Sequence, residues 1–290
     1  MNKIGILTDS HSGITQAEAE KIGVKVLPMP FYFGETCYYE NLDLTREDFF
    51  KRLAAGEEVT TSQPSPESVE KLWREALEEY EQIVYIPISS GLSGSCMTAA
   101  AMAQEEPFEG KVFVVDNGRV STPMHQSVLD AIALRDMGAS AGEIKKALED
   151  YRDKQVIYVG VDTLEYLKRG GRVSATAALL GNILNIKPVL KFDVGTLDLF
   201  QKCRGAAKMR KTMIEAMRYD LEHQFKEWYD RGAVYLLAAS SASKEATESW
   251  VAEIKEAFPG MEVRCDDLSL GVSCHIGPEG LGIGCSCRPY

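Results

Sequence analysis

The 290-residue sequence lacks a long apolar run and an excess of basic charge. No segment reaches the roughly 20 consecutive apolar residues needed to span a bilayer. The first seven residues run straight into the polar Thr8-Asp9-Ser10, a start too short and too soon polar for a signal peptide, so we expect a cytoplasmic protein. The net charge of −11 argues against general binding to nucleic acid.

The sequence also lacks a disulfide framework. Seven cysteines, an odd number, are scattered along the chain, which is typical of reduced cytosolic thiols. Cys285 and Cys287 could ligate a metal together with Cys274 and His275. However, this grouping does not have the paired ligand spacing of structural zinc sites, so we expect no metal.

The usual nucleotide motifs are missing, because no G-x-G-x-x-G follows the first apolar run and no GK[ST] follows a glycine loop. The nucleophile elbow of serine hydrolases, G-x-S-x-G, is incomplete. The sequence reads Gly91-Leu92-Ser93-Gly94-Ser95, with serine in place of the last glycine. The alternative function is therefore a serine esterase or thioesterase, with Ser93 as nucleophile and His275 as base. The spacing of these residues in the sequence does not support this alternative.

What the sequence does have is a turn with four serines and two glycines, residues 89–95, which we call the serine turn. Before it, Ile83–Ile86 is a short apolar run typical of a buried strand. After it, residues 96–105 contain neither glycine nor proline, which favours a helix. Backbone N–H groups at such a strand-to-helix turn suit an anion, although Gly-Ser turns also serve as plain connectors.

The first half of the chain alternates strands with helices, which predicts a parallel, doubly wound sheet. Helix caps are expected at Thr45, at Ser65 before Pro66, and at Ser140 with Glu143. Polar residues follow three of the strands, at the edge where such sheets bind ligands. The expected strands cover residues 3–7, 24–28, 83–88 and 112–115, and the main helices 15–22, 124–137 and 141–153.

The pattern changes near residue 154, where hairpin signals predict a mixed sheet. We therefore expect an α/β protein of two domains, residues 1–154 and 155–290. The expected strands of the second domain cover residues 155–161, 189–192, 196–200, 233–239, 261–268, 271–275 and 281–286. Its helices are expected over 164–168, 175–184, 206–229 and 243–257.

One segment reverses the acidic balance of the chain. Residues 168–211 contain ten basic and two acidic residues, so this segment carries +8 and the remainder −19. Basic residues in such a block usually lie on solvated helix faces. Here they are concentrated enough to suggest that the segment binds an anionic headgroup or an acidic partner.

Five motifs in sequence order resemble the DegV family of bacterial fatty-acid-binding proteins. A Thr8-Asp9-Ser10 turn after the first strand belongs to the same pattern, so the resemblance covers essentially the whole chain. The motifs are Thr61-Ser62-Gln63-Pro64-Ser65, the serine turn, Leu167 to Arg172, Leu184 to Leu190, and His275-Ile276-Gly277-Pro278.

The resemblance implies a non-catalytic protein that holds one long-chain fatty acid, such as palmitate, and needs no cofactor. Its carboxylate would be anchored at the domain interface by Thr61, Ser62, Ser93 and His275, with the acyl chain inside the second domain. The helix over 175–184 is a candidate wall for that chain.

Some members of the family are carrier subunits of a fatty acid kinase, which phosphorylates the bound acid to acyl-phosphate. The residues that would contact this partner are Arg169, Arg172 and Arg204, all within the basic segment. The resemblance also allows a transient membrane contact. The chain departs from the family at Glu279, where glycine is usual, and at Cys274 and Asn117-Gly118.

Overall fold

The computed structural model describes residues 3–40, 42–174, 185–195 and 197–290. The chain forms two compact units. The N-terminal unit comprises Met1–Arg152 with Ser269–Gly271 and Pro289–Tyr290, and the C-terminal unit comprises Asp153–Leu268 with Val272–Arg288. Within the described ranges, no helix is long and apolar enough to cross a membrane.

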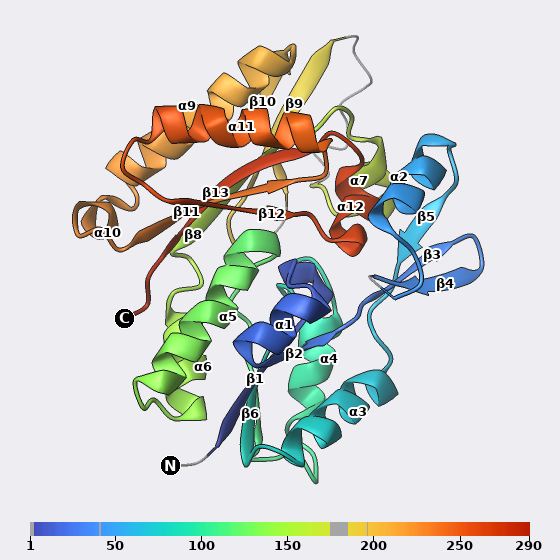
Figure 1. Ribbon diagram of the computed structural model, residues 1–290, viewed down its shortest axis with the longest axis vertical. Coiled ribbons are helices and arrows are strands. Elements are labelled where there is room, and N and C mark those ends of the chain that lie inside the picture. The colour runs from blue at the N-terminus through green and yellow to red at the C-terminus, as the bar shows by residue number, and fades with distance from the viewer. Residues whose placement is uncertain (1–2, 41, 175–184, 196) are drawn as a thin grey trace. The chain divides into compact units, whose positions relative to one another are not determined.

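The N-terminal unit contains a four-stranded parallel sheet in the order β2-β1-β6-β7. Figure 1 shows helices on either side of it. The strands are β1 (Ile4–Asp9), β2 (Val24–Leu27), β6 (Gln82–Ile86) and β7 (Val112–Val114). The helices are α1 (Gln16–Ile22), α3 (Pro66–Leu77), α4 (Ser95–Met102), α5 (Ser121–Asp136) and α6 (Ala141–Asp150).

Two apolar cores cover the two faces of this sheet. Ile6 packs with Ile144 of α6 in one core, while its neighbour Leu7 packs with Trp73 of α3 in the other. Successive side chains of a strand point to opposite faces, so each strand contributes to both cores. The predicted doubly wound parallel sheet is therefore confirmed.

The three predicted helix caps are also confirmed. Thr45 caps α2 (Arg46–Ala54), and its hydroxyl accepts a hydrogen bond from the N–H of Asp48 at 3.1 Å. Ser65 caps α3, which has Pro66 in its first turn. Ser140 and Glu143 form a complete capping box at the start of α6.

Sequence reasoning missed a small antiparallel sheet in the order β4-β3-β5. Its strands are β3 (Pro30–Phe33), β4 (Thr36–Tyr39) and β5 (Val59–Thr61). Phe31 and Phe33 of β3 are buried against Phe49 of α2, with ring centroids 5.5 and 5.7 Å from that of Phe49. This sheet matters because Thr61, a predicted site residue, is the last residue of β5 and pairs with Phe31.

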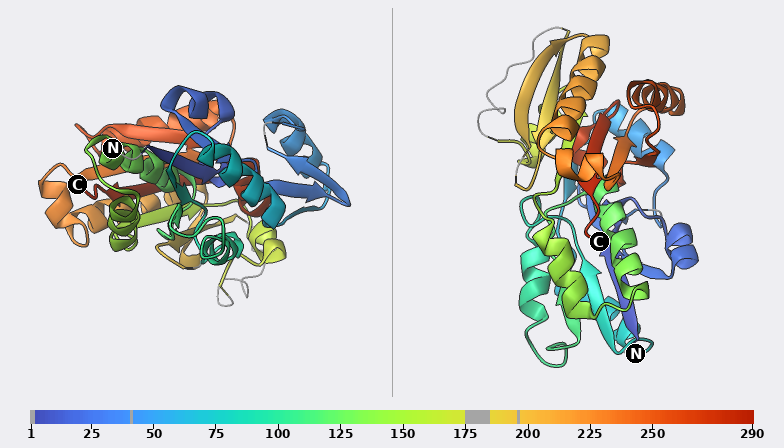
Figure 2. Two further views of the ribbon diagram at one scale, coloured as in Figure 1. Left: turned by 90° about the horizontal axis from the view of Figure 1, so that it is seen from below. Right: turned by 90° about the vertical axis from the view of Figure 1, so that its left-hand side faces the viewer.

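The C-terminal unit contains a mixed sheet of six strands in the order β10-β9-β8-β13-β11-β12. The predicted hairpin of β9 and β10 is confirmed, and helix α9 packs on β8, β9 and β10 (Figures 1 and 2). The strands are β8 (Gln155–Gly160), β9 (Ile186–Phe192), β10 (Asp198–Arg204), β11 (Val234–Ser240), β12 (Val263–Asp267) and β13 (Leu281–Cys287). The helices are α7 (Glu165–Gly170), α9 (Ala206–Glu222), α10 (Lys226–Asp230), α11 (Lys244–Ala257) and α12 (Leu270–Ile276).

Two predictions for this half of the chain are wrong. The expected strand over 271–275 is the helix α12, in which Leu270 and Cys274 are buried one turn apart. The expected helix over 206–229 is two helices, because His223 leaves the helical conformation and Phe225 turns into the core. The expected helix over 175–184, the candidate wall for the acyl chain, lies outside the described residues.

Candidate functional site

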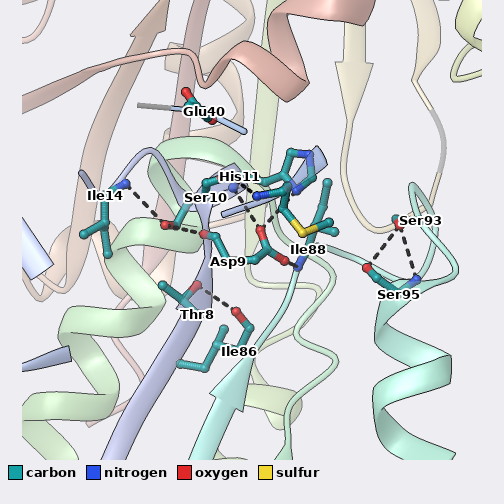
Figure 3. Close-up of polar contacts among 12 residues, drawn as sticks. Thr8, Asp9, Ser10, His11, Ile14, Glu40, Ile86, Ile88, Ser93 and Ser95 are labelled. Atoms are coloured by element: carbon teal, nitrogen blue, oxygen red, sulfur yellow. Dashed lines mark hydrogen bonds and ion pairs between the residues drawn. The ribbon is translucent and has the colours of Figure 1, made fainter. Parts of the chain in front are cut away.

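The loops that follow β1 and β6 are joined by one buried carboxylate, that of Asp9 (Figure 3). Its Oδ1 accepts a hydrogen bond from the backbone N–H of His11 at 2.9 Å, and its Oδ2 accepts one from the N–H of Ile88 at 2.9 Å. His11 Nδ1 also lies 3.1 Å from Oδ1. Asp9 thereby fixes the loop that leads into the serine turn.

The serine turn is anchored on its other side by Asp116, which follows β7. The Ser90 hydroxyl donates to Asp116 Oδ2 at 2.6 Å, and Arg152 Nη1 donates to the same oxygen at 2.7 Å. Burial raises the pKa of Asp116, but the hydrogen bonds from Ser90 and the positive charge of Arg152 outweigh it and hold the pKa below its usual value. Ser90 is thus a structural residue of the turn.

Ser93 has different contacts. Its hydroxyl donates to Ser95 Oγ at 3.0 Å and accepts from the Ser95 backbone N–H at 3.2 Å, both within the turn that starts α4 (Figure 3). These hydrogen bonds hold the Ser93 oxygen at the start of α4, and they link it to no other element in the part of the chain that the structure describes. The side chain is partly buried.

The Thr61–Ser65 loop lies beside the serine turn within the N-terminal unit. A methyl group on Gly94 would lie 3.1 Å from Gln63 Oε1, so these two loops are in close contact at that point. Ser62 is exposed, and its hydroxyl donates to the Gln63 carbonyl at 3.0 Å. The structure thus places the loop that carries Thr61 and Ser62 next to the turn that carries Ser93.

His275 lies on α12, in the part of that helix that belongs to the C-terminal unit. Its imidazole packs directly against Gly170, the last residue of α7. A Cβ atom at Gly170 would overlap the imidazole Nδ1. Glycine at 170 therefore leaves the space that the imidazole occupies.

The backbone of Glu279 is left-handed, with φ of 61°. This conformation favours glycine because a Cβ atom is crowded there. Ser241 braces the same loop, since its hydroxyl donates to the Gly277 carbonyl at 2.7 Å. The loop after His275 therefore keeps a glycine-like conformation despite the glutamate.

The basic segment is partly explained by local ion pairs. Lys187 pairs with Asp162 at 2.7 Å and Arg210 with Glu253 at 3.0 Å. Arg172 Nη1 donates to the Gly170 carbonyl at 2.6 Å, which closes the end of α7. Arg169 and Arg204 have exposed side chains, at the end of α7 and the end of β10.

Sequence reasoning named Asp9 only as a polar residue at the end of the first strand, and it gave no role to several other buried titratable residues of the N-terminal unit, among them His11 and Glu40. The position of Asp9 at the end of an apolar strand indicates a polar group at the sheet edge, but not its hydrogen bonds to two loops. Nothing in the local pattern indicates that Glu40 is buried, since it follows a strand with exposed residues. Among the described residues, no group of three His, Cys, Asp or Glu side chains could hold a metal ion.

The described residues define an α/β protein with a parallel and a mixed sheet, and with hydroxyl-rich loops meeting beside α4. The family model described as "Uncharacterised protein, DegV family" matches residues 3–287. The chain belongs to the DegV family.

Three similar proteins illustrate this membership. A DegV domain-containing protein of Deinococcus radiodurans is 30% identical over 282 residues, 97% of each chain. A solved structure described as fatty acid binding of a DegV family protein from Thermus thermophilus has a TM-score of 0.86 and 31% identity, and covers 98% of this chain and 99% of its own. The solved structure of DegV from Bacillus subtilis, described as a fatty acid binding protein, has a TM-score of 0.85 and 26% identity. The match covers 99% of this chain and 100% of the Bacillus subtilis chain.

Proposed function

We propose that this protein binds one long-chain fatty acid and performs no chemistry on it. The observation that carries the proposal is the full-length likeness, in sequence and fold, to the fatty-acid-binding DegV family protein of Thermus thermophilus. The proposed anchors of the carboxylate are Thr61, Ser62 and Ser93 from the N-terminal unit and His275 from the C-terminal unit.

The chemistry of these side chains supports that role. A carboxylate taken out of water needs several hydrogen bonds, or it takes up a proton instead. Three hydroxyls and an imidazole N–H can donate such bonds, and bonds to a charged acceptor are the stronger kind. The acyl chain adds about 0.8 kcal/mol for each buried CH₂ group, so tight binding requires no ion pair.

The first prediction concerns Ser93. In Ser93→Ala we expect the affinity for palmitate to fall by about tenfold or more, because a hydrogen bond to a charged group contributes roughly 1.5–3 kcal/mol. Isothermal titration with delipidated protein measures this. The thermal unfolding midpoint should stay unchanged, since the Ser93 hydroxyl contacts only its own turn among the described residues.

The matched control is Ser249→Ala, which removes an exposed hydroxyl of α11 and should leave the affinity unchanged. Equal affinity of Ser93→Ala and the parent protein would remove Ser93 from the anchors. Stoichiometric labelling of Ser93 by a fluorophosphonate probe would instead support the esterase alternative.

We further propose that the protein presents the bound acid to a fatty acid kinase, with Arg169, Arg172 and Arg204 at the contact. The positive charge of the segment that contains them supports this role. Arg204 gives the cleanest test, because its side chain is exposed at the end of β10.

The second prediction is that Arg204→Glu lowers the rate of acyl-phosphate formation by about tenfold while fatty-acid affinity stays unchanged. Reversing a charge at an interface slows association without touching the ligand site. The assay combines the palmitate-loaded protein with the kinase of the same organism. Lys244→Glu is the control, because this charge reversal lies on an exposed part of α11. An unchanged rate for Arg204→Glu would contradict the proposed contact.

A further inference from the structure

Glu40 is a buried glutamate that the proposed site does not use. Only 8% of its surface is exposed, although the strand before it, β4, is largely solvent-facing. Its Oε1 accepts a hydrogen bond from the backbone N–H of Leu270 at 2.7 Å. Its Oε2 is buried and makes no hydrogen bond of normal geometry among the described residues, although the Ser10 hydroxyl lies near enough to lower the pKa of the carboxyl group. This carboxyl group is therefore only half satisfied, and its ionised form is costly there.

The contact holds one particular segment of the chain. Ser269–Gly271 belongs to the N-terminal unit and contains the first two residues of α12. The N–H groups of a first helical turn have no acceptor within the helix, and the Glu40 carboxyl group supplies one at Leu270. Since α12 ends at Ile276, the start of the helix that carries His275 is bound by a residue 230 positions earlier in the chain.

Gly271 adds a second contact within the same unit. A Cβ atom at Gly271 would lie 2.7 Å from His11 Nε2, so the segment packs closely on the imidazole. His11 is in turn hydrogen bonded to Asp9, which is tied to the loop after β6 (Figure 3). The start of α12 is thus fixed at two adjacent residues, at Leu270 by Glu40 and at Gly271 by His11.

We propose that the contact between Glu40 and Leu270 is a proton-dependent latch, closed while Glu40 is neutral and loosened when Glu40 ionises, and that it positions His275 through α12. The latch is a feature of the N-terminal unit alone. Its effect on ligand affinity rests on the fatty-acid-binding function proposed above.

The direction of the proton dependence follows from the surroundings of Glu40. Burial raises its pKa to about 7, and this outweighs the Leu270 N–H, the His11 imidazole, the Ser10 hydroxyl and the Arg46 guanidinium, which all lower it. In an opened state that exposes Glu40 to water, the pKa returns toward its usual value of 4.5. The closed state therefore binds the proton more tightly, so closure is most favoured at low pH and weakens as the pH rises toward 7.

Hydrogen exchange of the Leu270 amide tests the latch without any ligand. After correction for intrinsic exchange, its protection should fall by about tenfold per pH unit between pH 5 and 7, because opening releases one proton. In Glu40→Gln, which keeps the shape and cannot ionise, protection should be independent of pH and higher than in the parent protein at pH 8. Glu35→Gln makes the same charge change at an exposed residue and should behave like the parent. Equal pH profiles of Glu40→Gln and the parent protein would overturn the latch.

Palmitate affinity tests the link to His275. At pH 8 we expect Glu40→Gln to bind palmitate more tightly than the parent protein, and at pH 5.5 the two should bind equally. In a His275→Ala background the difference at pH 8 should disappear, because residues that act through one another are not additive. A difference that persists in that background would overturn the positioning role. Failure of the parent protein to bind palmitate at any pH would instead contradict the proposed function, while the exchange experiment would still decide the latch.

Discussion

Replacing Gly170 by alanine should reduce the affinity for a long-chain fatty acid by about tenfold to a hundredfold. The new methyl group would overlap the His275 imidazole and force the ring to move. If His275 donates a hydrogen bond to the carboxylate, its loss costs roughly 1.5–3 kcal/mol, which corresponds to that range. Titration of the delipidated protein with palmitate measures the effect.

The stability of Gly170→Ala should stay close to that of the parent protein, which distinguishes a loss of affinity from unfolding. Gly170 is the last residue of α7 and its backbone is not left-handed, so alanine there is free of backbone strain. Gly195→Ala is the matched control, because a Cβ atom at Gly195 meets no described atom within 4 Å. A Gly170→Ala variant with full affinity would show that His275 does not anchor the ligand.

Asp9→Asn should lower the free energy of unfolding of the N-terminal unit by about 2–4 kcal/mol. Asp9 is fully buried and accepts hydrogen bonds from two backbone N–H groups through different oxygens. An asparagine can accept only one of them, and its NH₂ group then faces the other donor, so a buried N–H is left unsatisfied. Urea denaturation followed by the fluorescence of Trp73, which is buried in this unit, reports the change.

The control for this prediction is Asp136→Asn, since the Asp136 side chain is 62% exposed and pairs with the neighbouring Arg135. An exposed ion pair contributes little, so stability should change by less than about 1 kcal/mol. If Asp9→Asn were as stable as this control, the hydrogen bonds of Asp9 would not be what holds the loops after β1 and β6 together.

Local signals in the sequence were sufficient to predict much of the fold. Ser65 before Pro66 and Ser140 before Glu143 predict helix starts because a cap depends on residues three positions apart. The sheet of β3, β4 and β5 was missed because Phe31, Tyr32 and Phe33 form a continuous aromatic run without the alternation of a half-exposed strand. Its core is completed by Phe49, which lies far from β3 in sequence.

The errors at the site have a related cause. Helix α12 is only seven residues long, and its start is bound by Glu40, 230 residues away. No local pattern can contain that contact, so the sequence predicted a strand there. Ser93 and Thr61 were proposed as site residues from motifs, whereas the contact between the loops that carry them depends on Gln63 and Gly94. That contact becomes visible only in the folded chain.

Native mass spectrometry of the protein purified from cells is the most direct test of whether the protein carries a long-chain fatty acid. We expect a mass excess equal to one long-chain fatty acid, lost on denaturation. Delipidated protein should regain one equivalent after incubation with palmitate. A ligand-free spectrum that stays unchanged after incubation with palmitate and with longer acids would contradict the proposed function.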